Sequence, residues 1–529
     1  MSFVAEPVSA ESVPITPSVK AWDRVWWGLA STLVSQVIAA ASAIALVPLF
    51  LRAWGAEGYG RWLLLVAVVS SLSLLELGGQ SLFGNLLAYA HVRRDTDAFR
   101  RHLGEAVSVF SVVASLAFVG LVITVVIGAQ LSSAMRLTPT DQTIVIFLGA
   151  TYLLTVPSGV YVTAYRATER FARGTMVGNL VGGIALLAYG AVLLAGLGPG
   201  VYAITMLAAC TTGTLVIVAD IRRQIPAARG LPLGLAEARA GGRHLGSSLH
   251  FSILAVAAAV NQQAVLLVLA ASAGPAVVAL YATHRTAAGL VNYVGRVFEA
   301  PLRPELTFLH AAGNERDLRR ATLLSIKVVT LLSGTLACGV WLTLPWVYPL
   351  WTGRHLDLAP VLMAVLLFQT ALAAGWTTAG WSLLASNRHH ALAYCAVLNA
   401  CATVSLALLL APRFGALGVA SASLAGDVVF GAVLYPLLAA RSSGFPLTPG
   451  YRALVLPLAW AVATAAVGTL LGTTLEGWLL LLAGALFIFG CAYGAVRTTF
   501  EKDERLVVAR RLHRLWTDML SRCLAIVGS

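Results

Sequence analysis

Leu86-Leu-Ala-Tyr-Ala-His91, followed by Phe99-Arg-Arg101, returns 219 positions later as Glu305-Leu-Thr-Phe-Leu-His310, followed by Leu318-Arg-Arg320. Further pairs keep almost the same offset: Arg170 with Arg388, and Gly200-Val-Tyr-Ala203 with Gly418-Val-Ala-Ser421. Both copies lie in apolar sequence. A duplicated hydrophobic unit is typical of transporters built from two similar helical bundles, and the alternative is chance similarity between Ala- and Leu-rich helices.

The composition places the chain in a membrane. Of its 529 residues 58% are hydrophobic and 11% are charged, whereas a soluble domain carries about 25% charged residues. Many apolar runs reach the length of about 20 residues that a helix needs to cross the hydrocarbon core. Because these runs are unbroken rather than alternating, they predict helices and not barrel strands. The predicted fold class is an all-α polytopic membrane protein.

The apolar runs predict fourteen crossings in two bundles of six, with two extra helices at the end. The expected crossings are 25–51, 62–90, 104–129, 142–165, 176–196, 200–221, 246–271, 276–300, 322–347, 359–386, 391–411, 415–440, 453–472 and 477–496. These give the following units: an N-terminal tail (1–24), a first bundle (25–221), a linker (222–245), a second bundle (246–440), two further spans (453–496) and a tail (497–529). Since each bundle has an even number of crossings, the two should be related by an axis along the membrane normal.

The basic residues predict the orientation. The formal net charge is +13. With an inner N-terminus, 30 of the 36 Lys and Arg fall in inner segments and five in outer loops, so both termini are expected in the cytoplasm. Because the arginines lie in short loops between apolar runs, this charge indicates membrane orientation rather than nucleic-acid binding. The basic tail beyond Glu501 has apolar residues at helical spacing, which predicts an amphipathic helix on anionic lipid or, alternatively, a docking surface for a cytoplasmic partner.

No residue pattern predicts a metal or a cofactor. The six cysteines lack metal-type spacing, and five lie within apolar runs, where they are expected as small packed residues. Asp95-Thr-Asp97 resembles a metal-binding Asp-x-Asp, but it stands in a short basic loop and is read as a solvated charge cluster. We find no Ser/His/Asp grouping that predicts an enzyme.

Polar residues inside an expected span are candidates for function, because ionisable groups are expensive at bilayer depth. The span 276–300 has the clearest set, with spacings of 4, 7, 4 and 3 that place it on one helix face: Tyr281, Arg285, Asn292, Arg296 and Glu299. Arg285 lies roughly 14 Å from the outer end at 1.5 Å per residue, close to the midplane. A guanidinium there suits a phosphate, to which it can donate two parallel hydrogen bonds.

Other expected spans add further polar groups. Glu76 and Asp427 are candidates for carrying a coupling ion or for balancing the arginines, as is Glu299. The remaining candidates for substrate binding lie together in mid-span: Asn261, Gln262 and Gln263. Two interpretations of Arg285 stay open at this stage. It either lines a cavity, or it forms a buried ion pair with Glu76 or Asp427 that holds the bundles together.

The turn between the first two spans carries a family resemblance. It reads Pro48-Leu-Phe-Leu-Arg-Ala-Trp-Gly55-Ala-Glu-Gly-Tyr-Gly-Arg-Trp62, and it is followed by Leu74-Leu-Glu-Leu-Gly78 and Gly84-Asn85. This pattern resembles the bacterial polysaccharide transporters of the O-antigen flippase type, within the multidrug/oligosaccharidyl-lipid/polysaccharide (MOP) exporter superfamily. That family more often has Asp where Glu76 stands. Pro48 and the glycines are also expected to end one helix and turn into the next.

The resemblance implies a V-shaped pair of bundles in the bacterial inner membrane. It implies that the protein moves an undecaprenyl-diphosphate-linked oligosaccharide to the periplasmic leaflet for surface polysaccharide synthesis, alongside a polymerase and glycosyltransferases. Arg285 and Arg296 would then attract the diphosphate. A cation-coupled multidrug antiporter of the same fold is the alternative, although such pumps favour acidic, aromatic cavities. A membrane glycosyltransferase or glycan polymerase is disfavoured, because no outer loop is large enough for a catalytic domain.

Overall fold

The computed structural model describes residues 19–76, 79–131, 138–296, 314–385, 389–443, 445–472 and 492–501, together with a few isolated positions. Every regular element in these ranges is helical. Ten of the described helices are long and apolar enough to cross a membrane. The chain is therefore the predicted all-α, multi-pass membrane protein.

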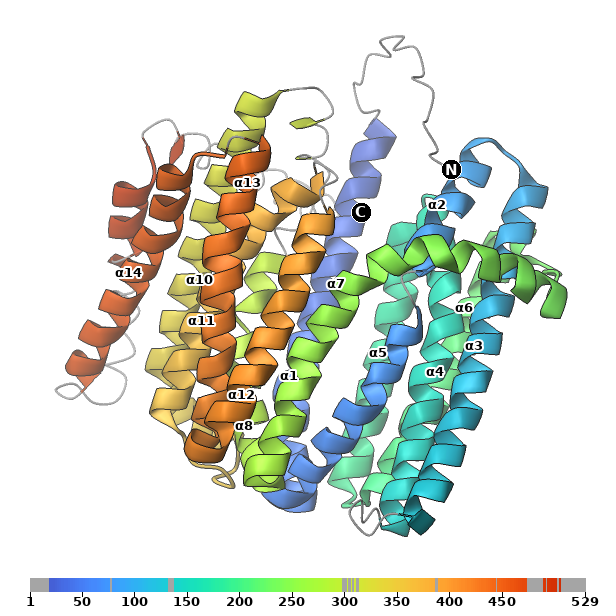
Figure 1. Cartoon of the computed structure of the whole chain (residues 1–529), viewed down its shortest axis with the longest axis horizontal. Helices are drawn as coiled ribbons and strands as arrows, with labels where there is room; N and C mark the ends of the chain where they lie inside the picture. Colours follow the sequence, from blue (N-terminus) through green and yellow to red (C-terminus); the bar gives the residue numbers. More distant parts are fainter. Residues whose placement is uncertain are drawn as a thin grey trace, which may run out of the picture.

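The first half of the chain, shown in blue to green in Figure 1, forms one bundle. Its elements are α1 (Val19–Ser70), the 3₁₀ helix η1 (Ser71–Glu76), α2 (Gly79–Val92), α3 (Thr96–Leu131), α4 (Pro139–Ala167), α5 (Phe171–Leu194) and α6 (Pro199–Gln224). Helix α1 contains the first predicted crossing and the start of the second, because its backbone turns at Gly55. Pro48 lies inside α1 and does not end it, so that part of the sequence interpretation was wrong and Gly55 alone makes the turn.

The second half forms the other bundle. After η2 (Pro226–Ala228) come α7 (Leu235–Ala273), α8 (Pro275–Gly289), α10 (Glu315–Trp351), α11 (Pro360–Ala385), α12 (His389–Gly426), the π-helix η3 (Asp427–Leu434), α13 (Tyr435–Ser443) and α14 (Leu447–Gly472). Helix α7 starts eleven residues before the predicted crossing 246–271, inside the predicted linker. The predicted crossing 477–496 lies mostly outside the described residues, and so does the tail beyond Arg505.

Backbone geometry confirms the internal repeat. Gly55 and Gly274 are 219 residues apart, and their φ/ψ angles are 68°/179° and 83°/172°. Gly196 and Gly415, also 219 apart, have φ angles of 68° and 54°. A positive φ with ψ near 180° is essentially restricted to glycine. The same turn therefore joins the first two crossings of each half, and we name the end of the molecule that carries these four glycines the turn end.

The second crossing of each half is broken at an equivalent place. In the first half, α-helical geometry gives way to η1 at Ser71. In the second half α8 stops at Gly289, and the amides of Leu290, Val291 and Tyr293 bond to carbonyls three residues back. Leu290 is 219 residues after Ser71. The sequence predicted unbroken helices here, because apolar runs do not reveal a change of hydrogen-bond register within them.

The two halves meet closely at the turn end. A Cβ at Gly60 would lie 1.8 Å from the backbone oxygen of Pro275, so glycine is required where α1 passes the start of α8. Ala279 of α8 is fully buried in a cluster of first-half side chains that includes Tyr59, Trp62 and Tyr202. At the turn end the two halves therefore pack directly against each other, with Ala279 of the second half among aromatic side chains of the first.

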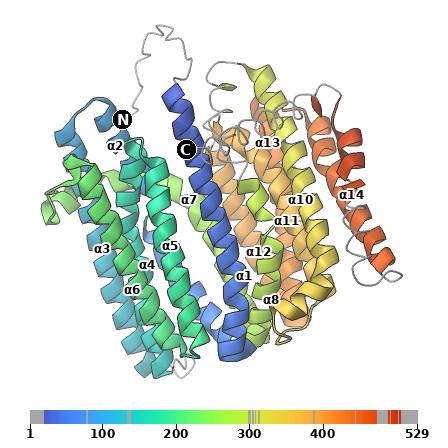
Figure 2. The same ribbon diagram turned by 180° about the vertical axis from the view of Figure 1, so that it is seen from behind.

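Away from the turn end the halves diverge, and α7 runs obliquely from one to the other (Figures 1 and 2). The first turns of α7 belong to the first half, where the ring of His244 lies 5.9 Å from that of Phe83 and the amide of Gly234 donates to Ser108 at 3.2 Å. Its later turns pack against α12. We name this opposite end, which carries the linker 225–234, the linker end.

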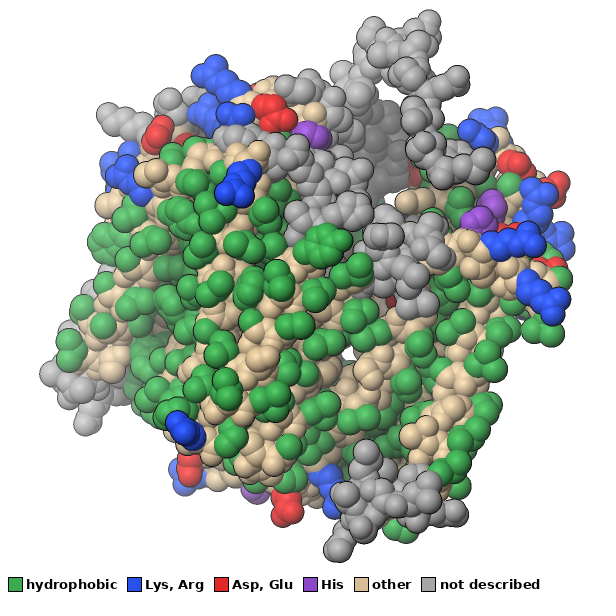
Figure 3. All heavy atoms as spheres, viewed as in Figure 1, with side chains coloured by type: hydrophobic (Ala, Val, Ile, Leu, Met, Phe, Trp, Pro, Cys, Tyr) green, Lys and Arg blue, Asp and Glu red, His purple; other side chains and the backbone are tan. Residues whose placement is uncertain are grey.

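Charged side chains also distinguish the linker end from the turn end. Figure 3 shows Lys and Arg side chains concentrated at the linker end and a hollow between the halves that reaches towards the middle of the molecule. The broad middle zone is covered by hydrophobic side chains, as a surface in contact with lipid must be. The basic end of the fold is thus the end that the sequence assigns to the cytoplasm.

The repeated turn gives a first prediction. Gly55→Ala and Gly274→Ala should each lower the free energy of unfolding by about 1–3 kcal/mol, because alanine is strained at this φ and ψ. Nothing lies within 4 Å of a Cβ at either site, so the loss would come from the backbone. Gly120→Ala in the helical interior of α3, where space is also open, should not destabilise. Thermal unfolding of the three purified variants in detergent would test this, and equal midpoints would contradict it.

Candidate functional site

The centre of the candidate site is the side chain of Arg285 on α8. Its guanidinium donates to Gln262 on α7 twice: Nη1 to the backbone oxygen at 3.1 Å and Nη2 to the side-chain Oε1 at 3.4 Å. The Arg285 side chain is half-buried and Gln262 is exposed. Two of the guanidinium nitrogens thus donate to neutral oxygens. Gln262 supplies no negative charge to offset the positive charge of Arg285.

Tyr281 lies one helical turn before Arg285 and connects it to a third helix. The tyrosine is 2% exposed, and it lies within electrostatic range of Arg285 and of Ser423 and Asp427. Ser423 donates to the carbonyl of Val419 at 3.1 Å. The surroundings of the guanidinium are thus built by α7, α8 and the segment from α12 into η3.

The structure bears directly on the ion-pair interpretation of Arg285. Neither Glu76 nor Asp427 forms an ion pair with it, although all three side chains belong to the described part of the chain. The cation that acts on Glu76 is Arg166 of α4. In the described arrangement, the charge of Arg285 does not hold the bundles together.

Asp427 is the most deeply placed acidic candidate, with 9% exposure. Its Oδ2 accepts from Nε2 of Gln369 at 2.9 Å, and its Oδ1 accepts from Nδ2 of Asn399 at 3.4 Å. Thr403 extends the network by donating to Oδ1 of Asn399 at 3.1 Å. The sequence analysis missed Gln369, Asn399 and Thr403, although each is a polar residue within an apolar span and could have been found by that signal.

The break after Gly289 divides the row of candidates on the predicted span 276–300. Tyr281 and Arg285 precede the break, whereas Asn292 and Arg296 follow it and are exposed. The guanidinium of Arg296 lies over the ring of Tyr293, 5.8 Å from its centroid. Because the helix is interrupted, the single face that regular spacing predicted does not continue through it. Glu299 lies outside the described residues.

The remaining candidates on α7 differ in surroundings. Gln263 is half-buried, and the buried Oδ1 of Asn261 has no hydrogen-bond partner among the described groups. A buried oxygen without a donor is costly, so this atom is suited to accept from a bound molecule or water. Among the described residues, no group of three or more His, Cys, Asp and Glu could hold a metal ion.

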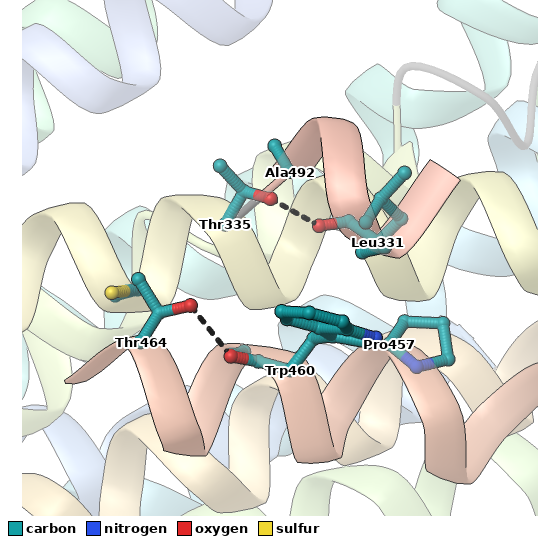
Figure 4. A pocket seen from close by; sticks show the side chains of 9 residues that line it. Leu331, Thr335, Pro457, Trp460, Thr464 and Ala492 are labelled. Carbon is teal, nitrogen blue, oxygen red and sulfur yellow. Dashed lines mark hydrogen bonds between the residues drawn. The ribbon is translucent and has the colours of Figure 1, made fainter. Parts of the chain in front are cut away.

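A small pocket elsewhere is not a substrate site. It lies between α10, α14 and residues 492–495, and Figure 4 shows Thr335 and Thr464 at its wall, each bonded to a carbonyl of its own helix. Its volume of about 10 Å³ is no more than one water molecule needs. The space between the two halves is therefore the better candidate for a large ligand.

Comparison with known proteins adds a fold but no close relative. No protein-family model matches the chain, and no curated protein matches its sequence. Among solved structures, the lipid II flippase MurJ in an inward closed conformation matches with a TM-score of 0.67 and 10% identity, over 88% of this chain and 99% of that chain. The chain has the fold of the MOP superfamily.

Two further structures agree. An inward-facing multidrug resistance MATE transporter of the MOP superfamily has a TM-score of 0.58 at 14% identity, covering 80% of this chain and 94% of that chain. A MOP superfamily transporter from Pyrococcus furiosus has a TM-score of 0.52 at 15% identity, covering 80% and 96%. All three are transporters or flippases and none is an enzyme. The MOP superfamily resemblance is thus confirmed at the level of the fold.

The environment of Arg285 gives a second prediction. Arg285→Met should change the free energy of unfolding by less than about 1 kcal/mol, because no buried carboxylate loses its partner. A side chain that neutralised a buried carboxylate would instead cost about 3–5 kcal/mol on removal. Arg61→Met is the matched control, since Arg61 pairs with Asp141, whose side chain is 5% exposed. Thermal unfolding in detergent should show a clear loss for Arg61→Met alone; a comparable loss for Arg285→Met would restore the ion-pair interpretation.

Proposed function

We propose that the protein is a flippase in the bacterial inner membrane. It moves a lipid-linked oligosaccharide, carried on undecaprenyl diphosphate, from the cytoplasmic to the periplasmic leaflet by alternating access. Its termini and its basic linker end face the cytoplasm. The exported glycan would serve surface polysaccharide synthesis, with glycosyltransferases supplying the substrate and a polymerase using the product.

The observation that carries this proposal is that Arg285 forms no ion pair with a carboxylate of the described residues. A guanidinium has five N–H donors, and Gln262 accepts from only two of its nitrogens. A charge inside a membrane protein is expensive unless a partner offsets it. An anionic ligand that enters between the halves would supply that partner, and a diphosphate matches the fork geometry of arginine.

Other groups support the same assignment. Arg296 and Asn292 are exposed beyond the break in α8, so they can meet a phosphate or a sugar before it reaches Arg285. Gln262, Gln263 and the unpartnered oxygen of Asn261 offer hydrogen bonds to hydroxyl groups. A lipid-linked sugar carries both kinds of chemistry, namely charged phosphates and many neutral hydroxyls.

Asp427 is proposed as the coupling group. Its partners Gln369 and Asn399 are neutral, and a buried carboxylate without a cation is strongly disfavoured. It would therefore take up a proton or a small cation in one state of the cycle and release it in another.

Asp427→Asn should remove the dependence of transport on the ion gradient, measured as uptake by proteoliposomes with and without imposed gradients. Unchanged gradient dependence would remove Asp427 from the coupling step.

The flippase proposal predicts the phenotype of one substitution. Arg285→Ala should abolish surface polysaccharide while the amount of protein in the membrane stays normal, because the site loses its cation without losing a structural ion pair. Arg285→Lys, which keeps the charge but not the fork, should retain part of the output. Arg413→Ala is the matched control, since Arg413 is an exposed arginine of α12 near the turn end. Unchanged glycan output in Arg285→Ala would refute the assignment of the site.

A multidrug antiporter of the same fold is the competing function. Its cationic substrates would be repelled by Arg285 and Arg296, so this structure favours an anionic substrate. Drug-resistance profiles of a deletion strain separate the two functions. Sensitivity to several cationic drugs, with normal surface glycan, would favour the antiporter.

A further inference from the structure

One backbone carbonyl of α1 has lost its partner within the helix. Pro48 lies inside α1 and has no N–H group, so it cannot donate to the carbonyl four residues earlier. That carbonyl belongs to Ile44. In a membrane-spanning helix an unpaired backbone oxygen is costly, and a neighbouring group is expected to satisfy it.

The donor comes from the other half of the molecule. The indole Nε1 of Trp351 donates to the backbone oxygen of Ile44 at 2.6 Å. Trp351 is the last residue of α10, 307 positions further along the chain. A side chain of the second half thus completes the hydrogen bonding of a helix of the first half.

The buried side chain of Tyr348 packs against the Trp351 indole. The indole meets the Tyr348 ring edge-on, with centroids 6.0 Å apart, and Tyr348 is fully buried. The Tyr348 hydroxyl lies 3.1 Å from Nδ1 of His284, while Nε2 of His284 accepts from the amide of Ala359 at 3.0 Å. His284 precedes Arg285 on α8, so the chain of contacts runs from the candidate substrate site to Ile44.

We propose that the bond from Trp351 to Ile44 is a latch between the two halves. It favours the conformation seen here, in which the turn end is closed, and it breaks when the halves separate at that end. Pro48 makes the latch effective, because its missing N–H leaves the Ile44 carbonyl without the donor that an α-helix supplies four residues later. The inference rests on the alternating access of the proposed function, but not on the identity of the substrate.

The latch has a direct thermodynamic test that needs no substrate. Ala279 is fully buried in the contact between the halves, so a cysteine there reacts with a thiol reagent only when the turn end opens. The experiment measures the rate at which a polar maleimide labels Ala279→Cys in the full-length protein with its native cysteines replaced. In detergent the reagent reaches both ends of the molecule, so orientation in a membrane does not matter.

Trp351→Phe keeps an aromatic ring, smaller than the indole, and deletes the N–H. It should raise the labelling rate roughly five- to tenfold, as expected when one hydrogen bond stabilises the closed population. Trp341→Phe is the matched control, because this indole on the same helix donates to Thr469 within the second half, at 2.9 Å. It should leave the rate unchanged.

Pro48→Ala supplies the decisive comparison. Alanine restores an N–H that can donate to the Ile44 carbonyl, so Trp351→Phe should have a smaller effect in this background than in the parent protein. Equal labelling rates for Trp351→Phe and Trp341→Phe would overturn the latch, and would show that α1 moves together with α10. A full effect of Trp351→Phe in the Pro48→Ala background would overturn the role given to Pro48. Neither result would depend on whether Arg285→Ala abolishes glycan export.

Discussion

The structure depends on one constraint, which is that lipid offers no hydrogen bonds to a backbone. Every amide and carbonyl at membrane depth must be satisfied inside the protein, and the apolar runs of this chain do so by forming helices. Departures from helix are therefore informative. They occur at the turn glycines, at the breaks after Ser70 and Gly289, at Pro48 and in the π-helix η3. Each freed backbone group needs a partner, and the partner named above for the Ile44 carbonyl, Trp351, joins distant parts of the chain.

The two halves share a backbone plan but not a chemistry. Gly55 and Gly274 make the same turn, and the second crossing breaks at corresponding positions in both halves. In the same register, however, Arg285 corresponds to Val66, Glu76 to Gly295, and Asp427 to Ala208. Duplication provides two bodies that can rock against each other. The candidate charges are distributed unequally, with Arg285 and Asp427 in the second half and Glu76 in the first.

The sequence predicted the helical class, most crossings and the repeat, because these depend on apolar length and on matching residues at a fixed offset, such as His91 and His310. The structure adds the pair Gly55 and Gly274 to these matches. The sequence did not predict the breaks at Ser71 and Leu290, since nothing in an apolar run marks a change of hydrogen-bond register. It also gave Pro48 the wrong role. Proline is tolerated inside a membrane-spanning helix when a neighbouring group satisfies the freed carbonyl, and here that donor, Trp351, comes from the other half.

In the candidate site, too, the sequence reveals single residues but not the contacts that they make in the folded protein. Arg285 and Asp427 stand out in the sequence because charge is rare in apolar spans. The pairing itself does not stand out, because Gln262, Gln369 and Asn399 become partners of these charges only once the helices pack together. That pairing decides the chemistry: a guanidinium bound to an amide remains available to an anion, whereas one bound to a carboxylate does not. The polarity of the space between the halves therefore follows from which neutral side chains the fold brings to each charge.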